Sequence, residues 1–206
     1  MIEVLVGTTN HGKFAEVEAY LQRLPLKLLS LQSLGSWPRL IEDGATFEEN
    51  ALKKARTLAE YFGLLTLADD SGLAVDALNG APGILSARYA GEEGNDAKNN
   101  EKLLIELKGI PERKRSARFV CVLALCAPDS DHPKKWIVRE QCEGRIAVAV
   151  KGEKGFGYDP LFFYPPFDKT FGEIDRESKA RVSHRGKALR KLSEILSSLF
   201  NLQAKT

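Results

Sequence analysis

Two acidic pairs in this sequence offer oxygen ligands for a divalent cation. Asp69 and Asp70 follow the apolar run 64–68, and Glu42 and Asp43 precede Gly44. Ligands of α/β proteins tend to lie at the carboxyl ends of buried strands, and Mg²⁺ takes carboxylate oxygens while keeping waters that phosphates replace. Neighbouring side chains of a strand point to opposite faces, so we expect one of Asp69 and Asp70 to face a site and the other to bond to the backbone or a basic neighbour. On spacing alone, an acidic loop that is simply solvated remains the alternative to a metal site.

Cations stand at the expected starts of two helices. Lys13 opens the first helix after the turn 8–12, and His184, Arg185 and Lys187 open the last. A cation at a helix N-terminus costs about 0.3–1 kcal/mol, but free N–H groups with added cations suit a bound phosphate. Side chains that point into water are the alternative. The segment 8–13 matches neither the P-loop nor the dinucleotide fingerprint, so it would be a different phosphate cradle.

A third group of polar residues lies on a well-marked helix. Thr46 and Glu49 form a capping box at its start, and apolar residues recur on one face from 47 to 62. Asn50 and Lys54 lie one turn apart and share a face. Lys53 is expected to pair with Glu49. Without further information, the pattern favours a surface position for Asn50 and Lys54.

The segment 152–160 combines glycines with aromatic residues. Gly155, Phe156, Gly157 and Tyr158 allow close backbone approach and an exposed ring on which a base could stack, a contact of about 1–3 kcal/mol. Asp159 beside them can accept hydrogen bonds from a base edge. An aromatic turn packed on the core is the equal alternative for Tyr158.

Alternating strand and helix patterns position these residues. Periodicity and turn residues predict a mixed α/β fold. The expected strands cover 2–6, 26–34, 64–68, 119–127, 136–138 and 145–150, and the expected helices cover 13–24, 47–62, 96–107 and a segment from His184 onward. The continuously apolar strand 119–127 is expected to be central and covered on both faces.

Composition excludes several classes of protein. The 206 residues fit one large domain or one domain of two lobes, with 43% hydrophobic and 28% charged residues. A net charge of +2 is too small for a nucleic-acid surface. Cys121, Cys126 and Cys142 include no CxxC pair, and nothing in their spacing indicates a disulfide framework or a zinc site. Cys121 and Cys126 lie inside an apolar run, which is typical of core thiols. No signal peptide or membrane-length apolar run is found, so we expect a soluble, cytoplasmic protein.

With these residues in place, the chain resembles the Ham1-like inosine triphosphate pyrophosphatases. The resemblance extends nearly end to end. It rests on motifs at residues 8–13 (TTNHGK), 42–50 (EDGATFEEN), 68–73 (ADDSGL), 80–89 (GAPGILSARY), 155–160 (GFGYDP) and 183–188 (SHRGKA). Each motif alone is weak, whereas their common order is specific. Two departures are Lys154 and Thr9, which stand where relatives more often carry glycine.

The resemblance implies a fold, a cofactor and a set of site residues. The fold would be a single two-lobed α/β domain over residues 1–206, with a long mixed sheet, a nucleotide cleft between the lobes, and a homodimeric assembly. Glu42 and Asp70 would hold Mg²⁺, and Asp70 would also activate the attacking water. Phosphates would be held by Thr8, Thr9, Asn10, His11, Gly12, Lys13 and Lys54. Nucleotide binding and base recognition would involve Ser71, Phe156, Gly157, Tyr158, Asp159, Lys179, His184 and Arg185.

The implied activity is hydrolysis of non-standard purine nucleoside triphosphates (ITP, dITP, XTP) to monophosphate and pyrophosphate. A nucleotide pyrophosphatase of different base preference is one alternative. A nucleotide-binding regulator without hydrolytic activity is another, although such a sensor has no need for a water-activating carboxylate. An RNA-binding module is disfavoured because the cations form no stripe with interleaved aromatics.

Overall fold

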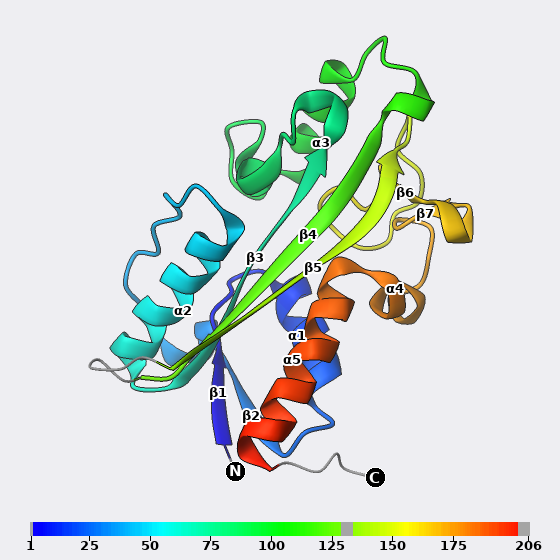
Figure 1. The fold of residues 1–206 in the computed structure, drawn as a ribbon. Helices are drawn as coiled ribbons and strands as arrows, with labels where there is room; N and C mark the ends of the chain where they lie inside the picture. Colours follow the sequence, from blue (N-terminus) through cyan, green and yellow to red (C-terminus); the bar gives the residue numbers. More distant parts are fainter. Residues whose placement is uncertain (1, 129–133, 202–206) are drawn as a thin grey trace. The chain divides into compact units, whose positions relative to one another are not determined.

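A computed structural model describes residues 2–128 and 134–201 and contains a seven-stranded sheet (Figure 1). The strands run in the order β2–β1–β3–β4–β5–β6–β7. They are β1 (Ile2–Val6), β2 (Leu26–Ser30), β3 (Leu65–Val75), β4 (Ser116–Cys126), β5 (Lys135–Ile146), β6 (Phe162–Tyr164) and β7 (Lys169–Thr170). β1 pairs in parallel with β2 and β3, while β6 pairs antiparallel with β5 and β7. The predicted mixed α/β sheet is therefore confirmed.

The chain divides into two compact units, which are described separately. Unit 1 comprises Met1–Asp70, Cys121–Glu140 and Arg185–Thr206, and unit 2 comprises Ser71–Val120 and Gln141–His184. The α-helices are α1 (His11–Leu21), α2 (Phe47–Phe62), α3 (Asp96–Glu106), α4 (Arg176–Val182) and α5 (His184–Phe200). Among the described residues, no helix combines the length and the apolar character that crossing a membrane requires.

In unit 1 the side chains of β1 alternate between two helical layers. Val4 and Val6 pack with residues of α1 and α5, while Leu5 packs with Leu58 of α2. Figure 1 shows α2 on one side of these strands and α1 with α5 on the other. Because both faces are covered, β1 carries three consecutive buried apolar residues, Val4, Leu5 and Val6. The same alternation places the side chains of Asp69 and Asp70 on opposite faces of β3.

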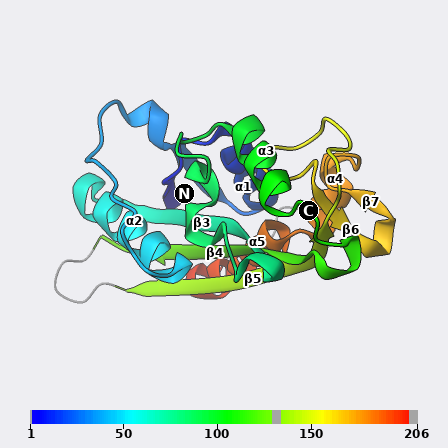
Figure 2. The same ribbon diagram turned by 90° about the horizontal axis from the view of Figure 1, so that it is seen from above.

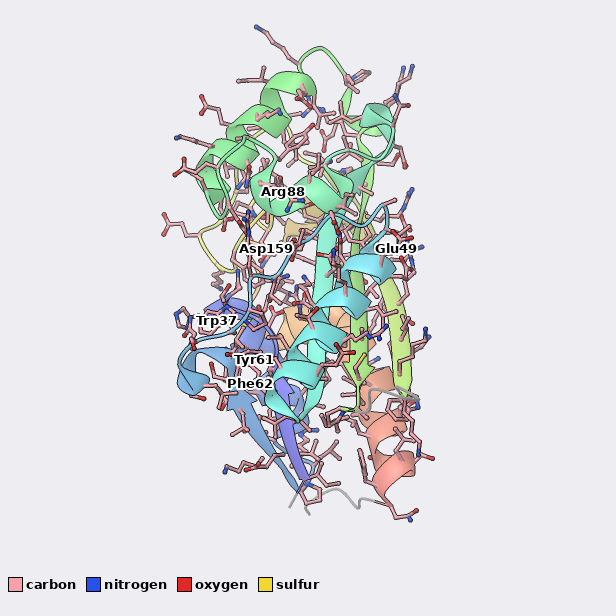
Figure 3. The ribbon with its side chains drawn as sticks, turned by 90° about the vertical axis from the view of Figure 1, so that its left-hand side faces the viewer. Trp37, Glu49, Tyr61, Phe62, Arg88 and Asp159 are labelled. Carbon is pink, nitrogen blue, oxygen red and sulfur yellow. The ribbon has the colours of Figure 1, made fainter. Side chains whose placement is uncertain are left out.

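Helix α2 begins and ends at the residues that its sequence predicts. Thr46 accepts a hydrogen bond from the Glu49 N–H, and the Glu49 carboxylate accepts from the Thr46 N–H, so the predicted capping box is confirmed. Gly63 ends the helix in the left-handed conformation. Figure 3 shows Glu49 in the first turn, and Phe62 in the last turn near Trp37. Phe62 and Trp37 pack on the Leu5–Leu58 cluster, which fixes α2 against the sheet.

Unit 2 has its own core, which combines aliphatic residues with a group of phenylalanines. Leu73 of β3 and Leu103 of α3 pack with Phe119, Phe162 and Phe171. The ring centroids of Phe119 and Phe162 are 4.5 Å apart. β6, β7 and α4 lie side by side in both views of the fold (Figure 1, Figure 2). This packing fixes the loop 152–160 between β5 and β6.

Several predicted boundaries were wrong. β3 is one strand from Leu65 to Val75, so Asp69 and Asp70 lie within it rather than after it. The register with β1 ends at Leu67, and β4 is the other neighbour of β3 in the sheet. β5 is likewise continuous from Lys135 to Ile146 instead of two short strands, and α4 was not predicted. The predicted core position of Cys121 and Cys126 is confirmed, since both are buried, and Cys142 is buried as well.

Candidate active site

Asp69 and Asp70 lie next to each other in β3, and their side chains point to opposite faces of the strand. The Asp69 carboxylate lies 2.9 Å from the Lys13 Nζ of α1. The Asp70 carboxylate lies 3.6 Å from the Lys54 Nζ of α2. Unit 1 therefore carries two charged clusters. We name them the Asp69 cluster (Lys13, Glu16, Asp69, Arg185) and the Asp70 cluster (Glu42, Asn50, Lys54, Asp70).

The Asp69 cluster is balanced in charge. Arg185 donates to Glu16 at 2.7 Å and to Asp69 at 3.3 Å, and its side chain is 2% exposed. Burial lowers the pKa of Arg185, but the carboxylates of Glu16 and Asp69 outweigh that effect and raise it. Lys13 is more accessible, with a side chain that is 20% exposed. Asp69 is thus the acid that bonds to basic neighbours, as predicted for one of the pair.

The turn before Lys13 forms the start of α1. Asn10 is the N-cap, and its side-chain oxygen accepts from the Lys13 N–H at 3.0 Å. The Thr8 hydroxyl accepts from the Asn10 N–H at 3.2 Å. The helix begins at His11, two residues earlier than predicted, and Thr9, Asn10 and His11 are exposed. The turn therefore combines helix N–H groups with the Lys13 cation, as a phosphate cradle requires.

The Asp70 cluster contains one cation for two carboxylates. The Lys54 Nζ lies 2.7 Å from Glu42 and 3.6 Å from Asp70. Burial lowers the pKa of Lys54, but Asp70, Asp69 and Glu42 outweigh it, so the pKa is raised and the amine stays charged. Burial raises the pKa of Asp70 to about 6, and Lys54 counteracts only part of this effect. A carboxylate with a pKa near neutrality is suited to accept a proton.

Asn50 and Lys54 are buried, so the surface position favoured by the sequence was wrong. Asn50 is fully buried and Lys54 is 7% exposed. The Gly44 N–H donates to the Asn50 side-chain oxygen at 2.8 Å, which draws the loop 42–46 onto α2. A Cβ at Gly44 would lie 2.7 Å from that oxygen, so glycine is required there.

Lys53 also differs from the prediction. It pairs with Asp43 at 2.6 Å rather than with Glu49, whose carboxylate accepts from the Ala45 and Thr46 N–H groups. The capping role of Glu49 thus takes precedence over an i, i+4 ion pair.

Unit 2 holds a second buried ion pair. Lys179 of α4 donates to Asp159 at 2.6 Å, and their side chains are 7% and 2% exposed. The Phe156 N–H donates to the same carboxylate at 2.9 Å, and the Lys179 Nζ lies 4.7 Å from the centre of the Phe156 ring. Gly155 has φ +78°, and a Cβ there would lie 2.0 Å from the Asp159 carboxylate. Phe156 and Gly157 remain half-buried.

The remaining predicted residues of unit 2 are two buried rings, Tyr158 and His184, and the half-buried Ser71. Tyr158 is 4% exposed and its hydroxyl donates to the Ser86 carbonyl, so the structure favours the core alternative for its ring. Burial raises the pKa of this hydroxyl. His184 is also buried and stacks on Phe119 with ring centroids 4.7 Å apart. Ser71 is half-buried within β3.

The donor set of the Asp70 cluster fits a divalent cation that arrives with phosphate. Mg²⁺ is usually bound through one or two carboxylates together with waters and phosphate oxygens. Glu42 and Asp70 supply two carboxylates, and Asp70 Oδ2 has no hydrogen-bond partner among the described residues. Within the same part of the chain, no group of three or more His, Cys, Asp or Glu side chains could hold a metal by itself. The residues therefore suit a shared rather than a fully protein-bound ion.

Three positioning residues escaped the sequence analysis. Glu16 binds Arg185, although 169 residues separate them. The Asp96 carboxylate accepts from the Gly157 N–H at 2.6 Å, and Asn100 donates to the Gly157 carbonyl at 2.9 Å. No local pattern marks such partners, because each acts on a residue that is distant in sequence.

Comparison with known proteins identifies the family. Two relatives, each a dITP/XTP pyrophosphatase, come from Syntrophobacter fumaroxidans and Desulforamulus reducens. The first is 49% identical over 204 residues, which cover 98% of this chain and 86% of the relative. The second is 47% identical over 199 residues, which cover 97% and 98%.

Solved structures agree with these relatives. A HAM1 protein from Coxiella burnetii is 42% identical with a TM-score of 0.87, covering 96% of this chain and all of that one. The model of the Ham1 family matches residues 4–195. The family resemblance drawn from the motifs is confirmed, and the chain belongs to the Ham1 family.

Proposed function

We propose that this protein hydrolyses non-standard purine nucleoside triphosphates, namely dITP, ITP and XTP, to the monophosphate and pyrophosphate. The observation that carries the proposal is the Asp70 cluster, in which a buried carboxylate of raised pKa adjoins a buried lysine and a second carboxylate. Perturbed groups of this kind concentrate at catalytic sites. Membership of the Ham1 family and the dITP/XTP pyrophosphatase names of the relatives support the same reaction.

Water attacks the α-phosphorus in this proposal, and pyrophosphate leaves. Such displacements depend on positioning and on neutralising charge more than on covalent chemistry. Lys13, together with the N–H groups at the start of α1, binds the triphosphate, and Lys54 supplies a second cation. Asp70 accepts the proton of the attacking water.

A divalent cation, proposed to be Mg²⁺, would be held by Glu42 and Asp70. When bound, it would neutralise phosphate oxygens. Asp70 has two carboxylate oxygens and about four lone-pair positions, so it can contact a cation and still accept a proton.

The residues of unit 2 are assigned to the base. The half-buried ring of Phe156 offers a stacking face, and Tyr158 and Gly157 contribute through the backbone of the loop. The Lys179 ammonium has donors only, so it pairs with the 6-oxo group of hypoxanthine or xanthine and opposes the 6-amino group of adenine. Ser71 and His184 stay in the proposed nucleotide site. Arg185 is reassigned from the base to the support of Asp69, because its side chain is 2% exposed and bound to two carboxylates.

The assembly is proposed to be a homodimer, as the family resemblance implies, and its location is proposed to be the cytoplasm. Sedimentation of the purified protein tests the dimer, with a monomer mass as the contrary result.

One assay tests the proposed function. Purified protein is incubated with ITP, XTP, dITP, GTP and ATP, with Mg²⁺ or with EDTA, and pyrophosphate is resolved from orthophosphate. We expect pyrophosphate from ITP, dITP and XTP, abolished by EDTA. Preferential hydrolysis of a triphosphate that carries another base would favour a pyrophosphatase of different specificity. Binding of a nucleotide without release of either product would favour a regulator.

A further inference from the structure

Asn50 has one half of its side-chain amide engaged and the other half without a partner. Its oxygen accepts from the Gly44 N–H at 2.8 Å. Its nitrogen is buried and has no hydrogen-bond partner in the described part of the chain, and the residue is fully buried. An unsatisfied buried donor costs free energy that native proteins rarely leave uncompensated. The nitrogen therefore points to an acceptor that the chain itself does not supply.

Asp70 presents the complementary group. Its Oδ2 is a buried acceptor that also lacks a partner among the described residues, while Oδ1 faces Lys54 at 3.6 Å. Asn50 and Lys54 lie one turn apart on α2, on the face that carries Lys54 to Asp70. The buried donor therefore lies one helical turn from Lys54, and the buried acceptor belongs to the carboxylate that lies 3.6 Å from the Lys54 ammonium.

The chemistry of the two atoms selects the ligand. A phosphate oxygen would suit the Asn50 nitrogen but would be repelled by Asp70, and a bare cation would suit Asp70 but not an N–H donor. A water molecule satisfies both, because it accepts one hydrogen bond and donates another. We propose that Asn50 Nδ2 and Asp70 Oδ2 together hold the water that attacks the α-phosphorus. This inference rests on the proposed function.

The step balances in atoms and charge. The Asn50 N–H occupies one lone pair of the water oxygen and leaves the other directed at phosphorus. As the new P–O bond forms, one water proton passes to Asp70 Oδ2. The bond from the α-phosphorus to the bridging oxygen breaks, and its electron pair leaves with pyrophosphate. Asn50 stays neutral throughout and acts by orientation, as water-positioning amides do in other phosphoryl transfers.

The variant Asn50→Asp tests this assignment. It keeps an oxygen for the Gly44 N–H and replaces the donor with an acceptor. We expect kcat for ITP to fall about 100-fold, with unchanged affinity for an ITP analogue that carries a methylene bridge between the α- and β-phosphorus atoms. Asn50→Ala should lower kcat as well.

Thr46→Ala is the matched control. It removes the capping box from the same end of α2 and leaves Asn50 intact, so it should lower the melting temperature and leave kcat unchanged. Parallel losses of kcat, analogue affinity and melting temperature in both Asn50 variants would make Asn50 a loop clamp and overturn the inference. An unchanged kcat in Asn50→Asp would overturn it too. A wild-type protein that releases no pyrophosphate would instead overturn the proposed function.

Discussion

The two faces of β3 hold the same residue type in opposite electrostatic circumstances. Asp69 meets two cations, Lys13 and Arg185, and its cluster pairs two carboxylates with two cations. Asp70 meets one cation, Lys54, which Glu42 shares. The excess negative charge and the burial together raise the pKa of Asp70 to about 6. Adjacent acids in one strand thus have different electrostatic environments because different helices cover them.

This contrast suggests that one cluster positions side chains and that the other takes part in the reaction. In the proposed mechanism, Arg185 remains beside Asp69 on the α1 and α5 face when Lys13 moves to a phosphate, so the buried carboxylate keeps a partner. On the α2 face, Asp70 keeps an oxygen without a protein partner in the described chain. We therefore assign the Asp69 cluster to positioning and the Asp70 cluster to reaction, and the predictions below test that division.

The largest expected effect is on turnover in Asp70→Asn. The amide cannot accept the proton of the water, so kcat for ITP should fall roughly 10²–10⁴-fold. Steady-state kinetics with pyrophosphate detection measures this loss. Near-normal turnover would remove Asp70 from the proposed role.

Arg185→Met should act on stability first. The substitution removes the cation between two buried or half-buried carboxylates, and breaking such a pair from one side costs about 3–5 kcal/mol. Urea unfolding measures the difference. Lys13→Met is the matched variant on the same face, and it should lose less stability but weaken the binding of tripolyphosphate. Equal stability of Arg185→Met and wild type would contradict the supporting role.

The raised pKa of Asp70 predicts an unusual dependence of stability on pH. The folded carboxyl, with a pKa near 6 against the ordinary 3.8, binds its proton more tightly than the unfolded chain does. This contribution is fully present below pH 3.8 and is lost as pH rises through 6. In EDTA, wild type should therefore lose on the order of 2 kcal/mol relative to Asp70→Asn between pH 4 and pH 7. Unfolding curves of both proteins at both pH values measure this change. If the pKa of the folded Asp70 were ordinary, the difference in unfolding free energy between wild type and Asp70→Asn would be the same at pH 4 and pH 7.

The smallest effect is expected for Lys53→Met. Lys53 neighbours Lys54 in sequence but pairs with Asp43 in the open, where their side chains are 44% and 63% exposed. Exposed pairs contribute less than about 1 kcal/mol. Unfolding and turnover should both match wild type, and a marked loss of turnover would show that the Asp70 cluster extends to the loop surface.

Local patterns in the sequence predicted the fold class and much of the site. The capping box at Thr46, the covered strand around Val122 and the helix from His184 follow from periodicity and turn residues, and each is present. The opposite directions of Asp69 and Asp70 followed from the strand geometry alone. These features depend on neighbours within a few residues.

Other features depend on contacts between distant segments and could not be predicted locally. Asn50 and Lys54 look like surface residues because their helix face is polar, yet the loop 42–46 and β3 cover them. Glu16 and Asp96 bind partners far away in sequence. The continuation of β3 past two acids depends on its neighbouring strands, since isolated acids would favour a turn.

Isotope labelling tests the central claim, attack of water on the α-phosphorus, most directly. ITP is hydrolysed with Mg²⁺ in H₂¹⁸O through a single turnover, and both products are analysed by mass spectrometry. We predict one ¹⁸O atom in inosine monophosphate and none in pyrophosphate. Label in the pyrophosphate would place the attack on the β-phosphorus and contradict the geometry assigned to Asp70.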